Sequence, residues 1–490
     1  MTSQEARTVA FAGAATPAAV DAACTGVKPR LSVIMPRGET FRNFVYTGAL
    51  DRVAESVDLD LLSVFPTPEL ESLLRSRYRS VTELAKVDEK FTVNYLREIL
   101  DMAHQRRVWS QAAIERWKLR DMDADTPAKK IKRIANKAVS RLFAHRPGLE
   151  FLDRLERAAS RAFRTTETFL QHFERTKPAL VFNGSHIHSR NSIAAVQAAK
   201  WLGIPTAAFC FSWDNLTSQG RVIPQHDYYL VWNEGIKRTL LNHYPKTKAE
   251  NVFVTGTPQF DFHYRKEFYW SREEFCQRIG ADPNRPIVLY STGMANHVAH
   301  EPRTVEDIAD MLKGMTDLGP PQLVVREYAK GPAGLYADLK TRRKDILFPK
   351  TDWELNWLTP KLDDCYLLTN MLRHCSVGIN VASTISLELC MFDKPCINVN
   401  YLPPGFDYYF DYRAYYQYEH YAPIVASGGL TLAGSEKEMA QQIRQHLTQP
   451  QAHSANRKQL LKDFFGGDLD GHVSDRLANC LIELTQRHAK

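Results

Sequence analysis

The sequence of 490 residues lacks the features that mark several specialised classes of protein. It has no uninterrupted apolar run near the ~18–20 residues that a membrane-spanning helix requires. Its N-terminus has no basic region followed by an apolar core, so we expect residues 1–28 to form a disordered leader rather than a signal peptide. Its eight cysteines include no Cys-x-x-Cys pair, which argues against a disulfide framework and structural zinc and favours a cytoplasmic protein. No group of histidines and cysteines has the spacing of metal ligands, and we therefore expect no bound metal and no cofactor.

The remaining composition is that of a globular protein with more than one domain. Hydrophobic residues make up 44% of the chain and charged residues 24%, which is ordinary for a folded protein. A chain of this length is too long for one hydrophobic core. Short apolar runs alternate with helical patterns, which predicts an α/β fold with doubly wound parallel sheets. The predicted strands are residues 30–36, 59–65, 179–182, 206–211, 228–232 and 252–255 in the first half and 286–290, 322–326, 376–379 and 395–399 in the second.

The most informative segment begins at the predicted strand 376–379. Asn380, Ser383 and Thr384 follow this strand in a short polar turn, and a helix containing Glu388 comes next. Unpaired backbone N–H groups and the helix dipole favour a phosphate at such a helix N-terminus. Glu388 lies about one turn further on, within reach of a ribose diol. An ordinary capped helix between two strands accounts for the same residue types, because Ser and Thr are common caps.

This segment resembles the donor-nucleotide motif of GT-B glycosyltransferases and of two related groups, the UDP-N-acetylglucosamine 2-epimerases and the CDP-glycerol glycerophosphotransferases. Glu388 precedes Lys394-Pro395 by six residues, the spacing at which those families place a ribose-binding Glu. The epimerases carry paired glycines where this chain has Ser383-Thr384, so the match to glycosyltransferases is better. The resemblance implies a GT-B-like fold, in which two Rossmann-like doubly wound domains face each other across a cleft.

The predicted domains follow from the strands and from this resemblance. Residues 29–265 form an N-terminal acceptor domain that carries a helical, basic insertion over about 70–172. Residues 285–434 form a nucleotide-donor domain after a polar link. The resemblance implies that the C-terminal helices, 435–490, pack back on the first domain.

Further donor contacts are expected after two other strands of the second half. Ser291, Thr292 and Gly293 follow the first of these strands, where the related families place a donor-phosphate loop. Arg326 ends the next strand, and its planar guanidinium suits a diphosphate. A salt bridge from Arg326 to an acidic residue is the alternative, and the families' Arg-x-His-Pro pattern is replaced here by Tyr328 and Ala329.

Two further pairs of residues are candidates for the hinge and the cleft. Gly256 and Thr257 close the last strand of the first half and resemble the Gly-x-Pro step that leads into the hinge in these families. A plain turn is the alternative. His300 and Glu301 follow the loop at Gly293 and are expected to contact the donor sugar or to span the cleft. Local hydrogen bonding with His297 would account for them equally well.

An inverting transfer requires a base that removes the proton of the acceptor hydroxyl. In this fold the base comes from the first domain, at the carboxyl end of a strand. Asp214 and His188 are the preferred candidates, and His186 and Glu39 are the others. Asp214 could instead cap the following helix, and single histidines are commonly structural. The sequence does not distinguish an inverting enzyme from a retaining one, which would need no such base.

The positive charge is concentrated in the helical insertion. Residues 106–164 contain sixteen Lys and Arg against seven Asp and Glu, an excess of nine, whereas the whole chain has a net charge of +7. Ile131, Ile134, Ala138 and Leu142 recur at three- and four-residue steps, which predicts an amphipathic, basic helix. A solvated insertion, an anionic membrane surface and nucleic acid all fit this pattern. Among the functional interpretations we favour a membrane surface or an anionic glycan acceptor.

The sequence and the resemblance together predict a metal-independent glycosyltransferase. Its donor would be a sugar linked to UDP, GDP, CMP or CDP, and its acceptor a cell-surface glycan or a lipid-linked glycan. We expect a cytoplasmic enzyme, with peripheral attachment to the inner face of the membrane as a further hypothesis. A CDP-activated polyol-phosphate transferase and a nucleotide-sugar 2-epimerase are the alternatives. A nucleic-acid-binding protein that is not an enzyme is the hypothesis from a different class, and the basic segment alone supports it.

Overall fold

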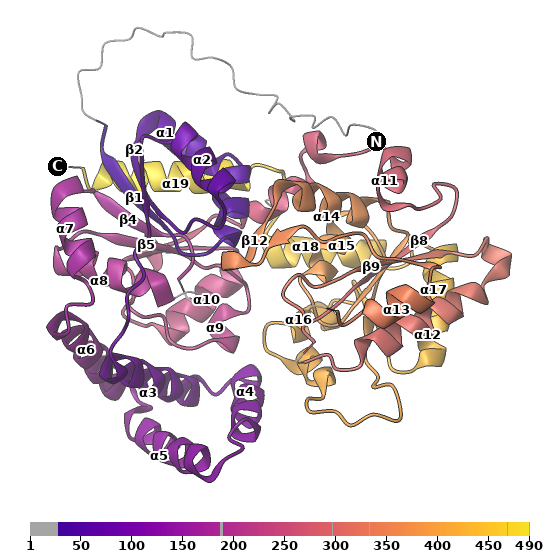
Figure 1. The fold of residues 1–490 in the computed structure, drawn as a ribbon, viewed down its shortest axis with the longest axis horizontal. Helices are drawn as coiled ribbons and strands as arrows, with labels where there is room; N and C mark the ends of the chain where they lie inside the picture. Colours follow the sequence, from indigo (N-terminus) through magenta and orange to yellow (C-terminus); the bar gives the residue numbers. More distant parts are fainter. Residues whose placement is uncertain (1–27, 187–189, 296, 333, 468, 490) are drawn as a thin grey trace, which may run out of the picture.

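The computed structural model describes residues 28–186, 190–295, 297–332, 334–467 and 469–489. They form two α/β domains that lie side by side, with a group of helices attached to the first (Figure 1). Within these residues, no helix combines the length and the apolar character that crossing a bilayer demands.

The first domain is built on a seven-stranded sheet in the order β3-β2-β1-β4-β5-β6-β7. All neighbouring strands are parallel, and Leu31 of β1 lies opposite Leu59 and Leu180. Strand β3 falls inside the region predicted to be helical. The strands are β1 (Arg30–Met35), β2 (Asp58–Ser63), β3 (Ser80–Glu83), β4 (Leu180–Asn183), β5 (Thr206–Phe209), β6 (Tyr228–Val231) and β7 (Val252–Val254).

Helices cover both faces of this sheet, which is why most residues of its central strands are apolar. Val33 of β1 packs in one core cluster with residues of α1 (Ala49–Ser56) and α19 (Val473–Arg487). The next residue, Ile34, belongs to a second cluster with residues of α7 (Glu167–Thr176) and α8 (Ile193–Trp201). Successive side chains of a strand point to opposite faces, so each face needs its own apolar cover.

The second domain holds a six-stranded sheet in the order β10-β9-β8-β13-β14-β15. Its neighbouring strands are also all parallel. Its strands are β8 (Ile287–Ser291), β9 (Gln322–Arg326), β10 (Ile346–Leu347), β13 (Val377–Asn380), β14 (Cys396–Val399) and β15 (Thr431–Ala433). A separate antiparallel hairpin consists of β11 (Trp353–Glu354) and β12 (Thr359–Pro360). The six-stranded sheet is contacted by the helices α12 (Glu301–Lys313), α14 (Leu362–His374), α15 (Ile385–Met391) and α17 (Glu436–Thr448).

The helical insertion forms a small layer at one end of the first domain (Figure 1). Its helices are α3 (Phe91–Val108), α4 (Gln111–Met122), α5 (Pro127–Phe143) and α6 (Arg146–Ala162). Helices α5 and α6 both pack on α3. Arg97 of α3 is fully buried and donates to Glu156 of α6 over 2.6 Å, and Gln197 of α8 donates to the same carboxylate. This buried ion pair joins α3 to α6 within the insertion, and breaking it would leave an uncompensated charge. The hydrogen bond from Gln197 links the pair to α8, which covers the sheet.

The chain passes between the domains twice, first after β7 and then before α19. Gly256 has a φ of +84° and lies so close to Val473 that an added Cβ would be 2.9 Å from its Cγ1. Asp261 accepts hydrogen bonds from the backbone N–H groups of Val473 and Ser474, and thereby caps α19. Arg265 donates to the carbonyl oxygens of Gly471 and Thr47, so it joins both crossings to the first domain.

The C-terminal helices divide between the two domains. Helix α19 packs on α1 of the first domain, as the resemblance implied. Helix α17 instead packs against β14, β15 and α12, and α18 (Ser454–Phe465) packs against α15 of the second domain. Met439 and Ile443 of α17 are buried in the second domain's core, which explains why this helix stays there.

Candidate functional site

The loop that follows β1 contacts the β11–β12 hairpin of the second domain. Gly38 donates its backbone N–H to the carbonyl oxygen of Trp357 over 2.7 Å. A Cβ on Gly38 would lie 1.6 Å from the Thr359 hydroxyl oxygen, so only glycine fits at this contact. The two domains are therefore in direct backbone contact at this edge of the cleft.

Glu39, one of the candidate bases, lies at the same contact. Its carboxylate accepts from Lys330 of the second domain over 2.8 Å and also pairs with Arg37. Burial alone would raise the pKa of Glu39, but the positive charges of Lys330 and Arg37 outweigh it and hold the pKa below its ordinary value. In this conformation Glu39 is an ionised partner in an ion pair that crosses the cleft.

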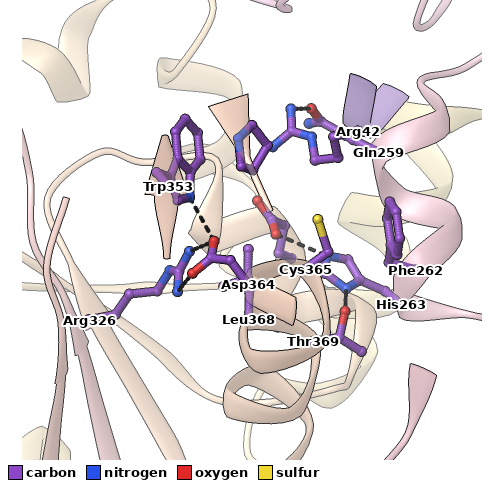
Figure 2. Close-up of a pocket in the computed structure, with 12 residues that line it drawn as sticks. Arg42, Gln259, Phe262, His263, Arg326, Trp353, Asp364, Cys365, Leu368 and Thr369 are labelled. Carbon is purple, nitrogen blue, oxygen red and sulfur yellow. Dashed lines mark hydrogen bonds and ion pairs between the residues drawn. The ribbon is translucent and has the colours of Figure 1, made fainter. Parts of the chain in front are cut away.

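A cavity of about 40 Å³ lies between the domains next to this contact (Figure 2). Arg326 and Glu388, two of the residues predicted to bind the donor, both line it. The other lining residues are Arg42, Gln259, Phe262, His263, Trp353, Pro360, Asp364, Cys365, Leu368 and Thr369. This volume holds about one small molecule such as water, far below the ~300 Å³ or more of typical ligand pockets. The cavity as observed is therefore too small for a nucleotide sugar.

Glu388 lies on α15 and points toward the segment that joins the domains. His263 donates from Nε2 to Glu388 Oε2 over 2.9 Å, and its Nδ1 lies 3.0 Å from the Thr369 hydroxyl. Glu388 as a whole residue is only 7% exposed, so its carboxylate is buried between the domains. Among the described residues, no hydrogen bond reaches the second carboxylate oxygen of Glu388.

The Arg326 side chain forms the salt bridge that the sequence left as the alternative. Its two terminal nitrogens donate to the two oxygens of Asp364 over 3.1 and 2.6 Å. Trp353 of the hairpin donates its indole N–H to the same carboxylate over 2.7 Å (Figure 2). A diphosphate would have to displace Asp364 in order to use the guanidinium fork.

The turn before α15 is organised mainly by its own side chains. Asn380 is fully buried, and its Oδ1 accepts from the N–H of Ser383 and from the hydroxyl of Ser386. Ser383 accepts from the N–H of Ile385 over 3.3 Å. Thr384 accepts from the indole N–H of Trp213, a residue of the first domain, over 3.1 Å. Asn380 thus shapes the turn from inside, whereas Thr384 faces the cleft.

The loop after β8 is supported from behind by Glu301. Both oxygens of Glu301 accept from the N–H of Gly293 over 3.0 Å, and the hydroxyls of Tyr290 and Tyr336 donate to the same carboxylate. Burial raises the pKa of Glu301 to about 7. Thr292 accepts from the N–H of Tyr328, and Ser291 is buried at the end of β8. Glu301 is therefore a support for this loop rather than a side chain that crosses the cleft.

The remaining candidates are spread over several local environments. His300 stacks on Phe406 with ring centroids 4.1 Å apart. It is not one of the residues that line the interdomain cavity. Thr257 is buried beside the hinge glycine. His186 is buried and donates from Nδ1 to the carbonyl oxygen of Phe209. His188 lies outside the described residues.

Asp214 precedes the short helix α9 (Asn215–Ser218). Its two carboxylate oxygens accept from the hydroxyls of Ser212 and Ser218 over 2.5 and 2.6 Å. Trp213 beside it contacts Tyr421 and Phe464 of the second domain as well as Thr384. This loop is thus part of the domain interface, and Asp214 is held there by neighbouring hydroxyls.

Several residues at the interface carried no recognisable signal in the sequence. His263, Asp364 and Lys330 each pair with a predicted site residue that is far away in the chain. In the part of the chain that the structure describes, no group of three His, Cys, Asp or Glu side chains could hold a metal ion. Asp58 and Asp60 of β2, which are spaced one residue apart, pair separately with Arg30 and His172.

No protein-family model and no curated protein matches the sequence. Solved structures do match its fold along almost the whole chain. A UDP-N-acetylglucosamine 2-epimerase is 13% identical with a TM-score of 0.52, covering 92% of this chain and 94% of the other. The UDP-GlcNAc 2-epimerase from Neisseria meningitidis, bound to UDP-GlcNAc, is 12% identical with a TM-score of 0.52, covering 93% and 99%. A glycosyltransferase from Rickettsia africae is 11% identical with a TM-score of 0.50, covering 95% and 100%. The predicted GT-B fold, with two Rossmann-like domains, is thereby confirmed.

Proposed function

We propose that this chain is an enzyme that uses a nucleotide sugar, and that it transfers the sugar to a glycan or lipid-linked acceptor. The observation that carries this proposal is that Arg326 and Glu388 line one cavity between the two domains of a GT-B fold. Ligands of parallel α/β sheets bind beyond the carboxyl ends of the strands, and the cavity lies in such a position for the second sheet. Similar folds among solved structures include a glycosyltransferase and an epimerase bound to UDP-GlcNAc.

In this proposal the ribose binds the free oxygen of Glu388, while His263 keeps the other oxygen oriented. The diphosphate binds near the turn of Ser383 and Thr384 and the loop of Ser291 to Gly293. Because the cavity is only about 40 Å³, the donor can enter only after the domains separate. Separation breaks the Glu39–Lys330 and Trp213–Thr384 contacts, which cross the cleft.

The proposed transfer step involves the acceptor hydroxyl, the anomeric carbon of the donor sugar and the leaving nucleotide. The oxygen of the acceptor hydroxyl forms a bond to the anomeric carbon. The bond from that carbon to the phosphate oxygen breaks, and the nucleotide leaves with its electrons. In an inverting reaction a base takes the hydroxyl proton, and Asp214, His186, His188 and Glu39 are the candidates. Domain opening would release Glu39 from Lys330. No metal is assigned a role in this scheme.

A groove of about 480 Å³ beside the helical insertion suits an anionic acceptor. Arg120, Lys132, Arg133 and Arg190 line it, together with the acids Glu98 and Asp101. The four cations come from three separate parts of the chain. We also propose a cytoplasmic location, supported by the seven described cysteines, which are all buried and free.

Thermal unfolding with a panel of ligands tests the proposal. A ligand at about 100 times its Kd stabilises the folded state by ~2.7 kcal/mol, or roughly 5–10 °C for a domain of 150–250 residues. We expect a shift with one of the UDP-, GDP-, CMP- or CDP-linked sugars and none with an RNA oligonucleotide. A shift with RNA alone would contradict the proposal and favour a nucleic-acid-binding protein. A shift only with a CDP-linked polyol would favour the polyol-phosphate transferase.

A 2-epimerase is the second candidate, because two of the compared structures with the same fold are epimerases. The two reactions differ in their products: a transferase moves the sugar to the acceptor, whereas an epimerase yields a sugar that is still linked to the nucleotide. A transferase releases the nucleoside diphosphate only when an acceptor is present, whereas an epimerase converts the donor to its epimer without any acceptor. Proton NMR of the donor in the presence of the protein, with and without acceptor, separates them.

A further inference from the structure

Helix α5 faces the protein with its polar side. Asn136 and Ser140 are its buried residues, and Asn136 donates to Glu98 of α3 over 2.9 Å. Arg133 donates to Asp121 of α4 over 2.9 Å and lies over the ring of Trp117. Val139 and Phe143 of α5 also pack, partly buried, against an apolar cluster of α3 and α6. Hydrogen bonds, ion pairs and this small apolar contact therefore hold α5 on its neighbours. An amphipathic helix on a globular protein normally packs in the opposite sense.

The apolar side of α5 faces away from the protein. Ile131, Ile134 and Leu142 are 69%, 67% and 70% exposed. They lie on one face together with Ala135 and Ala138, because residues three, four and seven apart share a face of a helix. Single exposed apolar residues are common, but an ordered stripe of them along one helix marks an interaction site.

Helix α6 continues this apolar surface beyond the turn that joins the two helices. Phe151 and Leu155 are 53% and 41% exposed. Phe151 stacks on Phe143 at the end of α5, with ring centroids 6.1 Å apart. Leu149 and Leu152, on the other side of α6, are buried against the insertion. Both helices of this hairpin therefore expose apolar residues while they remain fixed to α3.

Basic residues border the stripe on both sides. Lys130 and Arg141 lie on one side of the α5 stripe and Lys132 on the other, as the helical repeat of 3.6 residues places them. Lys130, Lys132 and Arg141 are exposed. Among the described residues, no ion pair involves Lys130 or Arg141. Arg154 is exposed on α6 near Leu155.

We propose that the α5–α6 hairpin docks on an anionic lipid bilayer, with Ile131, Ile134, Leu142, Phe151 and Leu155 inserted at the interface. Helices that bind in the plane of a membrane carry an apolar face bordered by Lys and Arg, which attract anionic lipid. A second copy of this chain fits less well, since a two-fold contact through α5 would bring like charges together. Nucleic acid also fits less well, because Phe151 is the one ring among the five proposed contact residues and a binding strand would need several on which its bases stack. This inference does not depend on the proposed reaction.

Co-sedimentation of the full-length protein with vesicles tests this surface. We would use vesicles of phosphatidylcholine alone and of phosphatidylcholine with phosphatidylglycerol, each at low and high salt. The apolar variant is Ile131→Ser/Ile134→Ser/Leu142→Ser, and the charge variant is Lys130→Glu/Arg141→Glu. The matched control is Leu355→Ser/Lys437→Glu, which changes one exposed Leu and one exposed Lys elsewhere.

We expect the wild type and the control to bind the anionic vesicles, and both test variants to bind at least tenfold more weakly. Binding of the wild type should also weaken with salt, because the Debye length falls from ~10 Å at 0.1 M to ~3 Å at 1 M. Far-ultraviolet circular dichroism checks that every variant is folded, and all the changes are at exposed positions. Equal binding of wild type and apolar variant would refute the proposal. A wild-type dimer that the apolar variant abolishes in sedimentation velocity, without vesicle binding, would assign the surface to a second copy.

Discussion

The buried carboxyl group of Glu301 predicts a specific dependence of stability on pH. Its pKa is about 7 in the folded protein, against an ordinary value of 4.5, because burial penalises the charged form. Between these two values the folded protein retains a proton that the unfolded chain has lost. The contribution of Glu301 to the free energy of unfolding is therefore complete below pH 4.5 and is lost as the pH rises through 7. The pKa difference of about 2.5 corresponds to roughly 3 kcal/mol, at 1.36 kcal/mol for each unit.

The variant Glu301→Gln isolates this contribution. The amide has almost the same shape but does not ionise in this range: its oxygen can accept from Tyr290 and from the Gly293 N–H, and its NH2 group can donate to the hydroxyl oxygen of Tyr336. We would measure urea unfolding of the wild type and the variant from pH 4.5 to 8.5. The wild type should lose stability relative to the variant between pH 4.5 and 7, and the difference should then stay constant. A difference that does not change with pH would refute the assignment of a raised pKa to Glu301.

Three further changes test the interdomain site. Glu388→Gln should weaken donor binding at least tenfold in calorimetry, while the amide oxygen still accepts the hydrogen bond from His263. Unchanged affinity would exclude Glu388 from the ribose site. Arg326→Lys removes the two-pronged contact with Asp364, so we expect a melting temperature several degrees lower. If this variant keeps its melting temperature but loses turnover, Arg326 acts on the donor instead. Gly38→Ala should separate the domains, since the new Cβ would lie 1.6 Å from the Thr359 hydroxyl, and small-angle X-ray scattering should give a larger radius of gyration. An unchanged radius would mean that the hairpin shifts locally.

The two sheets were predictable because most of their strands are buried on both faces. Runs such as Ile287 to Tyr290 are apolar without interruption, a pattern typical of parallel strands that are covered on both faces. Strand β3 was not predicted, because it lies at the edge of the sheet and has no buried residue. The β11–β12 hairpin was not predicted because each of its strands has only two residues, too few to show an apolar pattern.

The candidate site was predictable only in part. The positions of Arg326 and Glu388 follow from local patterns, namely a strand end and a helix after a polar turn. Their partners Asp364 and His263 are 38 and 125 residues away in the chain, and no local pattern connects them. The periodicity of α5 predicted an amphipathic helix correctly. It could not show which side faces the protein, because that depends on Glu98 and Asp121 of neighbouring helices.

The two crossings of the chain between the domains restrict how the domains can move relative to each other. Arg265 lies in the first crossing and is bonded to Gly471 and Ser474 of the second, while Asp261 caps α19. A single flexible linker would let one domain both swing and twist about the other. Two linkers that are bonded to each other allow rotation about the single axis that passes through both, and they oppose rotation about any other axis. The two domains should therefore open and close by the same rotation. Each closure should re-form the ion pair between Lys330 and Glu39.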